Sequence, residues 1–554
     1  MDLSRVALLQ LNTTPGDIDG NYAAILAAAH EAAAAGAQLA VTPELALVGY
    51  SPRDLLFRRR FVEAAADRMR ALAGEVSIPL IVGTVALRTG RGRPFSNVAV
   101  LLEGGQERAR WEKRLLPNYD IFDEARYFEP GPQGPVVTVA GTRIGVTICE
   151  DLWVQQQDLE VPRYSLDPAA SAVAAGAELI INLSASPYSR GKPAVRHELV
   201  HGTALRLGVP VALCNLVGGN DELIFDGNSV VLRADGSVIA QGPHCSSAVV
   251  LGHTVASSAV AGSVAEVRAA LVLGIRDYVN KCGFPGVLLG LSGGIDSAVC
   301  ACLCAEALGP KRVRGLLLPS EFSSEGSLTD ARALTKALGM PSDELPIDAT
   351  NRAALSGLER VLGTQPFGLM QENLQARVRG LLLMGMSNST GWMLVTTGNK
   401  SELATGYCTL YGDMCGGLAP IGDVWKTEVY ALAEGYAAEG LLPRASIDKA
   451  PSAELRPNQT DQDSLPPYEM LDQILRFHIE NGMGARAIIE AAPLLQPALV
   501  EQVLRLVAGS EHKRRQAAPG LKVSAKAFGT GRRIPLVAAS RAFHDWLRDG
   551  TGIS

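Results

Sequence analysis

The sequence has no apolar run long enough to cross a membrane and no Cys-x-x-Cys motif. Its 554 residues contain nine cysteines, an odd number, without a Cys-x-x-Cys motif, which argues against a disulfide framework and a zinc ribbon. No uninterrupted apolar stretch reaches the roughly 18 residues that a membrane helix needs. With 47% hydrophobic and 19% charged residues, the composition is that of a soluble globular protein, and we expect no membrane partner.

The net charge and the N-terminal residues indicate which partners and which cellular location to expect. The formal net charge of −6 gives no general affinity for nucleic acid, although a local basic patch could still bind a phosphate-bearing small molecule. Residues 1–5 lack the basic and apolar regions of a secretory signal. We therefore expect a cytoplasmic protein without a nucleic-acid partner.

Three cysteines alternate along one predicted helix, Cys300, Cys302 and Cys304. Residues at i, i+2 and i+4 cannot all share one helix face, so packing in a core is a better interpretation than a metal site.

Apolar strands alternate with Ala-rich helices along the whole chain, which predicts an α/β protein. At this length more than one core is expected. We predict one domain over 1–252, a weakly patterned linker over 253–263, and a second domain over 264–554. The expected strands in the first domain are 5–10, 38–41, 80–83, 97–102, 143–148, 179–181 and 210–213, with a helix over 22–35. The second domain should contain a helix over 264–282 and strands at 287–289, 313–318 and 393–396.

One octapeptide joins a strand to a helix in the second domain. It reads Gly290-Leu291-Ser292-Gly293-Gly294-Ile295-Asp296-Ser297. Glycines allow close backbone approach to an anion, the serines add hydroxyl donors, and the helix start carries partial positive charge. The lysine of a Walker A loop is missing, while Asp296 adds a carboxylate suited to Mg²⁺. The alternative is a tight structural turn.

The full string resembles the pyrophosphate loop of the ATP-pyrophosphatase family, whose members adenylate a carboxylate or carbonyl and then admit nitrogen or sulfur. The resemblance implies a Rossmann-like parallel sheet, ATP as co-substrate, and ATP contacts from residues 290–297.

Three residues of the first domain lie near strand ends and have complementary chemistry: Glu44, Lys113 and Cys149. A thiol with a pKa near 8.5 is only slightly ionised at neutral pH, so a carboxylate such as Glu44 must take its proton during attack on an amide. An ammonium such as Lys113 can stabilise the resulting oxyanion. We expect Cys149 to be presented at the end of its strand rather than buried in a helix.

These residues and their neighbours, Pro43-Glu44-Leu45, Glu112-Lys113 and Ile148-Cys149-Glu150-Asp151, resemble the Glu-Lys-Cys signature of the nitrilase superfamily over residues 1–250. The resemblance implies an α-β-β-α sandwich and release of ammonia through a thioester. It also implies a second glutamate, matched here by Glu124, for which a surface salt bridge with Arg126 is the alternative. By the same resemblance Tyr119, Ser186 and Lys192 would line a glutamine pocket.

Together the two halves are similar to the glutamine-dependent NAD synthetases. Supporting strings are Thr396 to Glu402, Pro451 to Leu455 and Lys526 to Pro535. The resemblance implies glutamine, ATP and deamido-NAD as substrates and a homo-oligomer. It implies Mg²⁺ on Asp296 and Glu402, an ATP contact from Thr397, and deamido-NAD contacts from Asn373, Glu402 and Lys513. Asn373 rests on spacing alone, and Lys513 lies in a charged run that could be a solvated face.

Two alternatives remain at this point. Another pyrophosphate-loop amidotransferase would act on a different acceptor, and a catalytically silent protein could share the fold. Two polar segments, 320–330 and 445–467, are either surface loops or lids over the nucleotide site.

Overall fold

The computed structural model describes residues 1–154, 164–252, 254–255 and 262–538. The chain forms two compact units, Met1–Ala270 and Leu271–Ser554. The division falls within helix α5 (Val264–Lys281). Of the predicted linker, residues 253 and 256–261 lie outside the described residues, and the boundaries proposed from the sequence stay a prediction.

In the described part of the first unit, two six-stranded sheets face each other. The first has the order β14-β1-β2-β3-β4-β5 and the second β13-β12-β9-β8-β7-β6. The strands of the first sheet are β1 (Val6–Gln10), β2 (Leu39–Val41), β3 (Leu80–Leu87), β4 (Phe95–Glu103), β5 (Gln106–Glu112) and β14 (Ala248–Val250). Those of the second are β6 (Val137–Val139), β7 (Thr142–Ile148), β8 (Leu179–Ser184), β9 (Val211–Asn215), β12 (Val230–Leu232) and β13 (Val238–Gln241). A separate hairpin consists of β10 (Val217–Asn220) and β11 (Leu223–Asp226).

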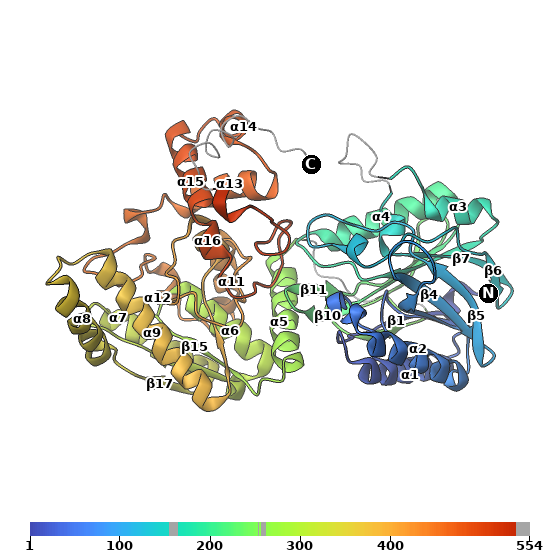
Figure 1. The fold of residues 1–554 in the computed structure, drawn as a ribbon, viewed down its shortest axis with the longest axis horizontal. Helices are drawn as coiled ribbons and strands as arrows, with labels where there is room; N and C mark the ends of the chain where they lie inside the picture. The colour runs from blue at the N-terminus through green and yellow to red at the C-terminus, as the bar shows by residue number, and fades with distance from the viewer. Residues whose placement is uncertain (155–163, 253, 256–261, 539–554) are drawn as a thin grey trace. The chain divides into compact units, whose positions relative to one another are not determined.

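Helices cover the outer faces of the two sheets. They are α1 (Ile18–Ala34) and α2 (Arg59–Glu75) on the first sheet, and α3 (Pro168–Ala174) and α4 (Lys192–Leu207) on the second. Figure 1 shows the two pairs on opposite sides of the sheets. Leu8, Val41, Ile81, Ile144 and Ile181 belong to the buried core between the sheets. The predicted α-β-β-α sandwich is therefore confirmed.

The parallel strands β7 and β8 are buried almost throughout, which explains why they read as continuous apolar runs. Edge strand β5 has the sequence QERARWE and is largely exposed. Its polarity gave no strand signal, so the prediction missed it. Helix α1 begins at Ile18, earlier than predicted, because the Asp17 side chain caps it by accepting the Gly20 N–H at 2.9 Å.

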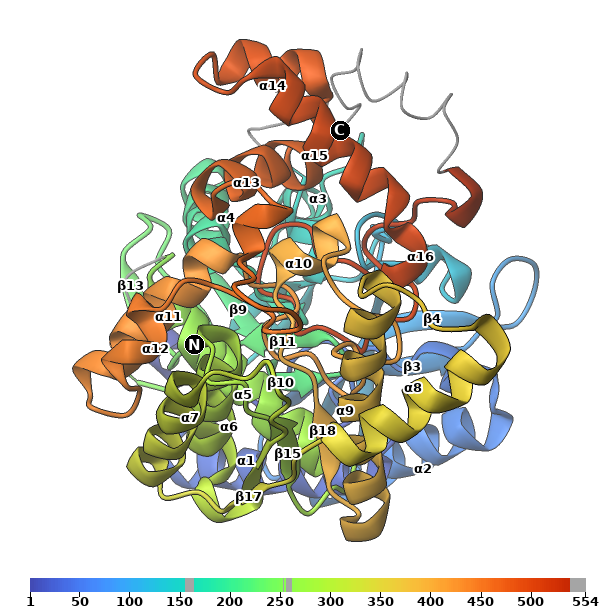
Figure 2. The ribbon, with the colours of Figure 1, turned by 90° about the vertical axis from the view of Figure 1, so that its left-hand side faces the viewer.

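The second unit contains a parallel sheet of order β17-β16-β15-β18. Its strands are β15 (Val287–Gly290), β16 (Val313–Leu317), β17 (Ser342–Glu344) and β18 (Met393–Val395). Figure 2 shows α6 (Ile295–Leu308) and α7 (Glu325–Leu338) on one side of this sheet, with α8 (Asp348–Leu362) and α9 (Leu369–Thr390) on the other. This is the predicted Rossmann-like arrangement. The carboxyl ends of β15 and β18 share one edge, where the nucleotide site was expected.

The remaining helices follow β18. They are α10 (Lys400–Thr405), α11 (Lys426–Ala438), α12 (Arg444–Asp448), α13 (Tyr468–Leu475), α14 (Ala485–Ala491), α15 (Pro497–Gly509) and α16 (Glu511–Arg514). Several of them share a core that includes Trp425, Leu471 and Val503. As predicted, Cys300, Cys302 and Cys304 are buried packing residues of α6. Within the described ranges, no helix is long and apolar enough to cross a membrane.

Candidate active sites

Glu44 lies three residues after β2 and is completely buried. Its Oε1 accepts hydrogen bonds from Lys113 Nζ and Asn97 Nδ2, both at 2.7 Å. Its Oε2 accepts the Ala185 N–H at 3.2 Å. These donors hold the carboxylate in one orientation at the carboxyl end of β2.

Lys113 directly follows β5 and joins two carboxylates. Its Nζ donates to Glu44 Oε1 at 2.7 Å and to Glu124 Oε1 at 2.8 Å. Burial alone would lower the pKa of Lys113, but Glu124 and Glu44 outweigh it and raise that pKa well above its usual value. The lysine is therefore an ammonium with a third N–H left to donate.

Glu124 is buried and also accepts the Tyr50 hydroxyl at 3.0 Å. Burial raises its pKa to about 7, against the lowering effect of Lys113. The surface salt bridge with Arg126, which the sequence left open, does not form within the described residues. Arg126 lies 3.6 Å from Asp54 instead.

Cys149 begins a 3-10 helix, Cys149–Leu152, at the end of β7 and has a positive φ of 45°. The expectation of a presented thiol was wrong, because the residue is only 5% exposed. Burial and the negative charge of Glu44 raise the pKa of the thiol well above its ordinary value, while Lys113 opposes the shift. The thiol is therefore neutral and needs a base to become a nucleophile.

Two of the predicted glutamine-pocket residues, Tyr119 and Lys192, contact the segment that begins at Cys149. Tyr119 donates to Glu150, the residue after the cysteine, at 3.0 Å. The Lys192 ammonium lies 4.4 Å from the ring centre of Trp153, which directly follows the 3-10 helix Cys149–Leu152. Ser186 follows β8, and its N–H donates to Asn215 at 2.9 Å.

In the second unit, the octapeptide turns from β15 into α6 as predicted. The Ser292 and Ser297 hydroxyls lie 3.2 Å apart, and the Gly294 N–H donates to Ser292 Oγ at 3.2 Å. Gly293 has φ of +76°, and a Cβ there would lie 2.2 Å from the Ser327 carbonyl oxygen. Only glycine fits this turn, which favours a specialised loop over an ordinary one.

Asp296, in the first turn of α6, meets residues from two other elements. Its Oδ1 accepts from Asn399 at 3.0 Å, and its Oδ2 pairs with the Lys426 ammonium. Glu402 is held by Asn399 in a reciprocal helix cap of α10. Burial and the nearby Asp296 raise the pKa of Glu402 well above its usual value. The described residues contain no group of three metal-binding side chains. Two close carboxylates nevertheless suit Mg²⁺, which often takes its other ligands from phosphates and water.

The structure gathers the predicted deamido-NAD residues around α10 and the loop that follows it. Asn373 of α9 accepts the Thr409 hydroxyl at 2.8 Å. Lys513 of α16 donates to the carbonyl oxygens of Gly406 and Cys408, both at 2.7 Å. Lys513 is thus not on a solvated face. Thr397 lies two residues after β18, at the edge of the sheet where the octapeptide follows β15.

The two segments predicted as loops or lids contact each other. Glu454 accepts hydroxyl hydrogen bonds from Ser324 at 2.9 Å and from Ser327 at 2.6 Å. Ser327 is also the residue against which Gly293 packs. Glu454 therefore contacts Ser327, the residue that packs against Gly293 of the octapeptide. Movement of either segment as a lid stays a prediction.

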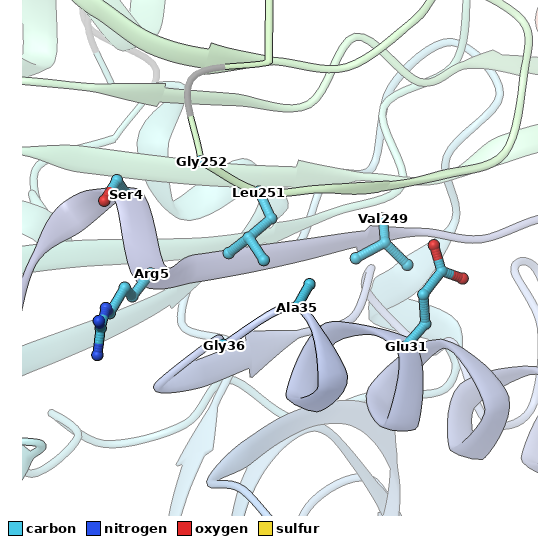
Figure 3. A pocket seen from close by; sticks show the side chains of 8 residues that line it. All are labelled: Ser4, Arg5, Glu31, Ala35, Gly36, Val249, Leu251 and Gly252. Atoms are coloured by element: carbon cyan, nitrogen blue, oxygen red, sulfur yellow. The ribbon is translucent and has the colours of Figure 1, made fainter.

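A hollow of about 500 Å³ lies elsewhere on the first unit, between α1 and β14 (Figure 3). Its lining residues are Ser4, Arg5, Glu31, Ala35, Gly36, Val249, Leu251 and Gly252. None of these belongs to the predicted sites, so the hollow does not mark the chemistry.

Sequence reasoning missed several residues that build the sites: Tyr50, Asn97, Glu150, Asp151 and Lys426. Glu150 and Asp151 were part of the cysteine motif, so their adjacency to Cys149 was a usable signal. The other three come from distant segments and carried no local signal.

Comparison with known proteins agrees with this two-unit organisation. A carbon-nitrogen hydrolase family model matches residues 5–260, and an NAD synthase model matches residues 267–517. The glutamine-dependent NAD(+) synthetase of Synechocystis is 45% identical to this chain. The alignment covers 97% of this chain and 99% of that protein.

Solved structures of such synthetases have the same fold. The one from Acinetobacter baumannii has 35% identity and a TM-score of 0.75, with 96% of this chain and 98% of that chain covered. The one from Cytophaga hutchinsonii has a TM-score of 0.83 at 24% identity, with 98% of both chains covered. The chain therefore belongs to the glutamine-dependent NAD(+) synthetase family.

Proposed function

We propose that this protein hydrolyses glutamine in its first unit and uses the ammonia to amidate adenylated deamido-NAD in its second unit, forming NAD, AMP, pyrophosphate and glutamate. The observation that carries the first half is the buried Glu44–Lys113–Glu124 network beside Cys149. The second half rests on the octapeptide with Asp296 at the carboxyl edge of a parallel sheet.

In the first reaction, Glu44 takes the proton from Cys149 Sγ as the sulfur bonds to the glutamine side-chain carbonyl carbon. Lys113 already donates two N–H groups to carboxylates and offers the third to the oxyanion. Glu44 then returns the proton to the leaving nitrogen, and ammonia departs from the thioester. Glu44 next activates water, whose attack releases glutamate and restores the thiol.

Glu124 has a supporting place in this proposal. It accepts hydrogen bonds from Lys113 and Tyr50, so it fixes the direction of the ammonium. Tyr119, Ser186 and Lys192 would bind the polar ends of glutamine. The contacts of Tyr119 with Glu150 and of Lys192 with Trp153, close to Cys149 in the chain, support that role for these two residues.

In the second reaction, a carboxylate oxygen of deamido-NAD attacks the α-phosphorus of ATP and expels pyrophosphate. Ammonia then attacks the activated carbonyl carbon, and AMP leaves. Residues 290–297 would hold the phosphates, and Thr397 would contact ATP. Asn373, Glu402 and Lys513 would bind deamido-NAD around α10. The related structure from Acinetobacter baumannii is described as a complex with adenosine diphosphate, which supports a nucleotide site of this kind.

Asp296 and Glu402 are the residues that would hold Mg²⁺. The bound ion would offset negative charge on the ATP phosphates. The nearness of the two acidic groups supports this assignment, because the charge of Asp296 raises the pKa of Glu402 and a divalent ion would relieve that repulsion.

The decisive experiment compares NAD formation from deamido-NAD with glutamine or with ammonium as nitrogen source. Cys149→Ala should abolish the glutamine-dependent reaction and leave the ammonium-dependent one unchanged. Equal loss of both reactions would contradict separate sites. Pyrophosphate release that requires another acceptor would contradict the proposed substrate.

The homo-oligomeric state and the cytoplasmic location expected from the sequence stay predictions. Size-exclusion chromatography with light scattering measures the first, and fractionation of cells that produce the protein measures the second.

A further inference from the structure

Asp151 is a buried carboxylate, 2% exposed, that accepts three backbone hydrogen bonds from two parts of the chain. Its Oδ2 accepts the Ile148 N–H at 2.9 Å, directly before Cys149. Its Oδ1 accepts the N–H groups of Leu115 at 2.9 Å and Arg114 at 3.1 Å, directly after Lys113. The side chain thus joins the segment that carries the thiol to the segment that carries the ammonium.

These two segments belong to different sheets of the sandwich. Lys113 follows β5 of the first sheet, and Cys149 follows β7 of the second. Glu44 follows β2, which lies in the same sheet as β5. The separation between nucleophile and base therefore depends on how the ends of the two sheets are held together, and Asp151 spans that gap.

We infer that Asp151 is a positioning residue that sets Cys149 at the correct distance from Glu44 and Lys113. The inference rests on the proposed glutaminase reaction. A carboxylate suits the task because both oxygens accept and neither donates. Asparagine has the same shape, but its amide nitrogen would replace one of the two oxygens. That nitrogen cannot accept a hydrogen bond, so the bond to Ile148 or the bonds to Arg114 and Leu115 would be lost.

The test measures glutamine hydrolysis by wild type, Asp151→Asn and the control Asp167→Asn. Asp167 also accepts a backbone N–H, from Ala170 at 2.9 Å, but it caps α3 and pairs with Arg206. We expect Asp151→Asn to lower kcat roughly 100-fold, since small displacements of reacting groups have effects of that size. KM for glutamine should stay within about threefold, because the proposed pocket residues are unchanged. The control should keep the wild-type kcat.

A second readout follows the thiol itself. Alkylation of Cys149 by iodoacetamide, measured by mass spectrometry, should slow in Asp151→Asn because the thiol moves away from its base. Ammonium-dependent NAD formation is measured to show that the second unit is intact. It should stay at the wild-type rate. An unchanged kcat, or a loss expressed only in KM, would overturn the inference.

If Asp151→Asn fails to fold, Asp151→Glu is used as the test variant instead. It keeps the charge but adds a methylene, so it should lower kcat with KM retained, and a wild-type kcat would overturn the inference. If neither variant folds, Asp151 is required for the fold and the positioning role is refuted. If the wild type itself does not hydrolyse glutamine, the proposed function fails instead, so the two failures are distinguishable.

Discussion

Glu44 and Lys113 form an ion pair in which both side chains are fully excluded from solvent and Oε1 lies 2.7 Å from Nζ. The pair links the ends of β2 and β5, which are not neighbours in their sheet. Because a buried charge is costly without its partner, removal of either side chain would leave the other unpaired in the core. In the proposed reaction this pair would preorganise a base and an oxyanion donor beside one thiol.

Replacement of that base should stop glutamine hydrolysis. We predict that Glu44→Gln lowers glutamate release 10²- to 10⁴-fold, the usual range for loss of a general base, while ammonium-dependent NAD formation is unchanged. The assay counts glutamate and NAD in parallel. The control is Glu63→Gln on the outer helix α2. Glu63 is exposed and forms an ion pair with Arg59. Wild-type glutamate release by Glu44→Gln would refute the role of Glu44.

The turn at Gly293 should tolerate no side chain. Gly293→Ala combines a φ of +76° with a Cβ 2.2 Å from the Ser327 carbonyl oxygen, so we expect distortion of the octapeptide. KM for ATP should rise at least tenfold, and glutamine hydrolysis should be spared. Gly357→Ala in α8 is a control in the same unit but outside the proposed site, since its added Cβ would meet nothing within 4 Å. Equal effects of the two variants would contradict this explanation.

Asp296 should be needed for NAD formation from either nitrogen source. Asp296→Asn keeps the shape and the bond from Asn399 but removes the charge opposite Lys426. We expect at least a 100-fold loss of both the glutamine- and the ammonium-dependent synthesis, because ATP activation precedes both. Asp343→Asn, which alters an ion pair with Arg314 on the same sheet, should keep wild-type rates. Survival of the ammonium reaction in Asp296→Asn would place Asp296 outside the ATP site.

Glu124 should make stability fall with rising pH. Burial raises its pKa from 4.5 to about 7, so the folded protein holds a proton that the unfolded chain has already lost between those values. The stabilisation is present below pH 4.5 and is lost as the pH rises through about 7. Relative to Glu124→Gln, the free energy of unfolding of the wild type should fall by on the order of 1 kcal/mol per pH unit in this window.

Chemical denaturation of both proteins from pH 5 to 8 measures this difference. Parallel pH dependences for wild type and Glu124→Gln would show that Glu124 ionises at its ordinary pKa. Glu63→Gln, an exposed substitution, should follow the wild type.

Local pattern was sufficient for the strands with apolar runs, because their burial follows the sequence. The apolar runs of β7, β8 and β15 are buried, and the glycine loop between β15 and α6 lies where its spacing predicted. Strand β5 escaped prediction, since an exposed edge strand is specified by its neighbour β4 rather than by its own hydrophobicity.

The sequence alone determined which residues are proposed for the chemistry, namely Glu44, Lys113, Cys149 and Asp296, since each stands in a recognisable local string. Their surroundings were decided by the tertiary structure. Only the folded chain brings Asn97 to Glu44, Lys426 to Asp296 and Asp151 between two sheets. It also buries the Cys149 thiol and directs Glu124 toward Lys113 instead of Arg126. The physical reason is that hydrogen bonds and burial join residues far apart in the chain, and these contacts have no periodic signature along it.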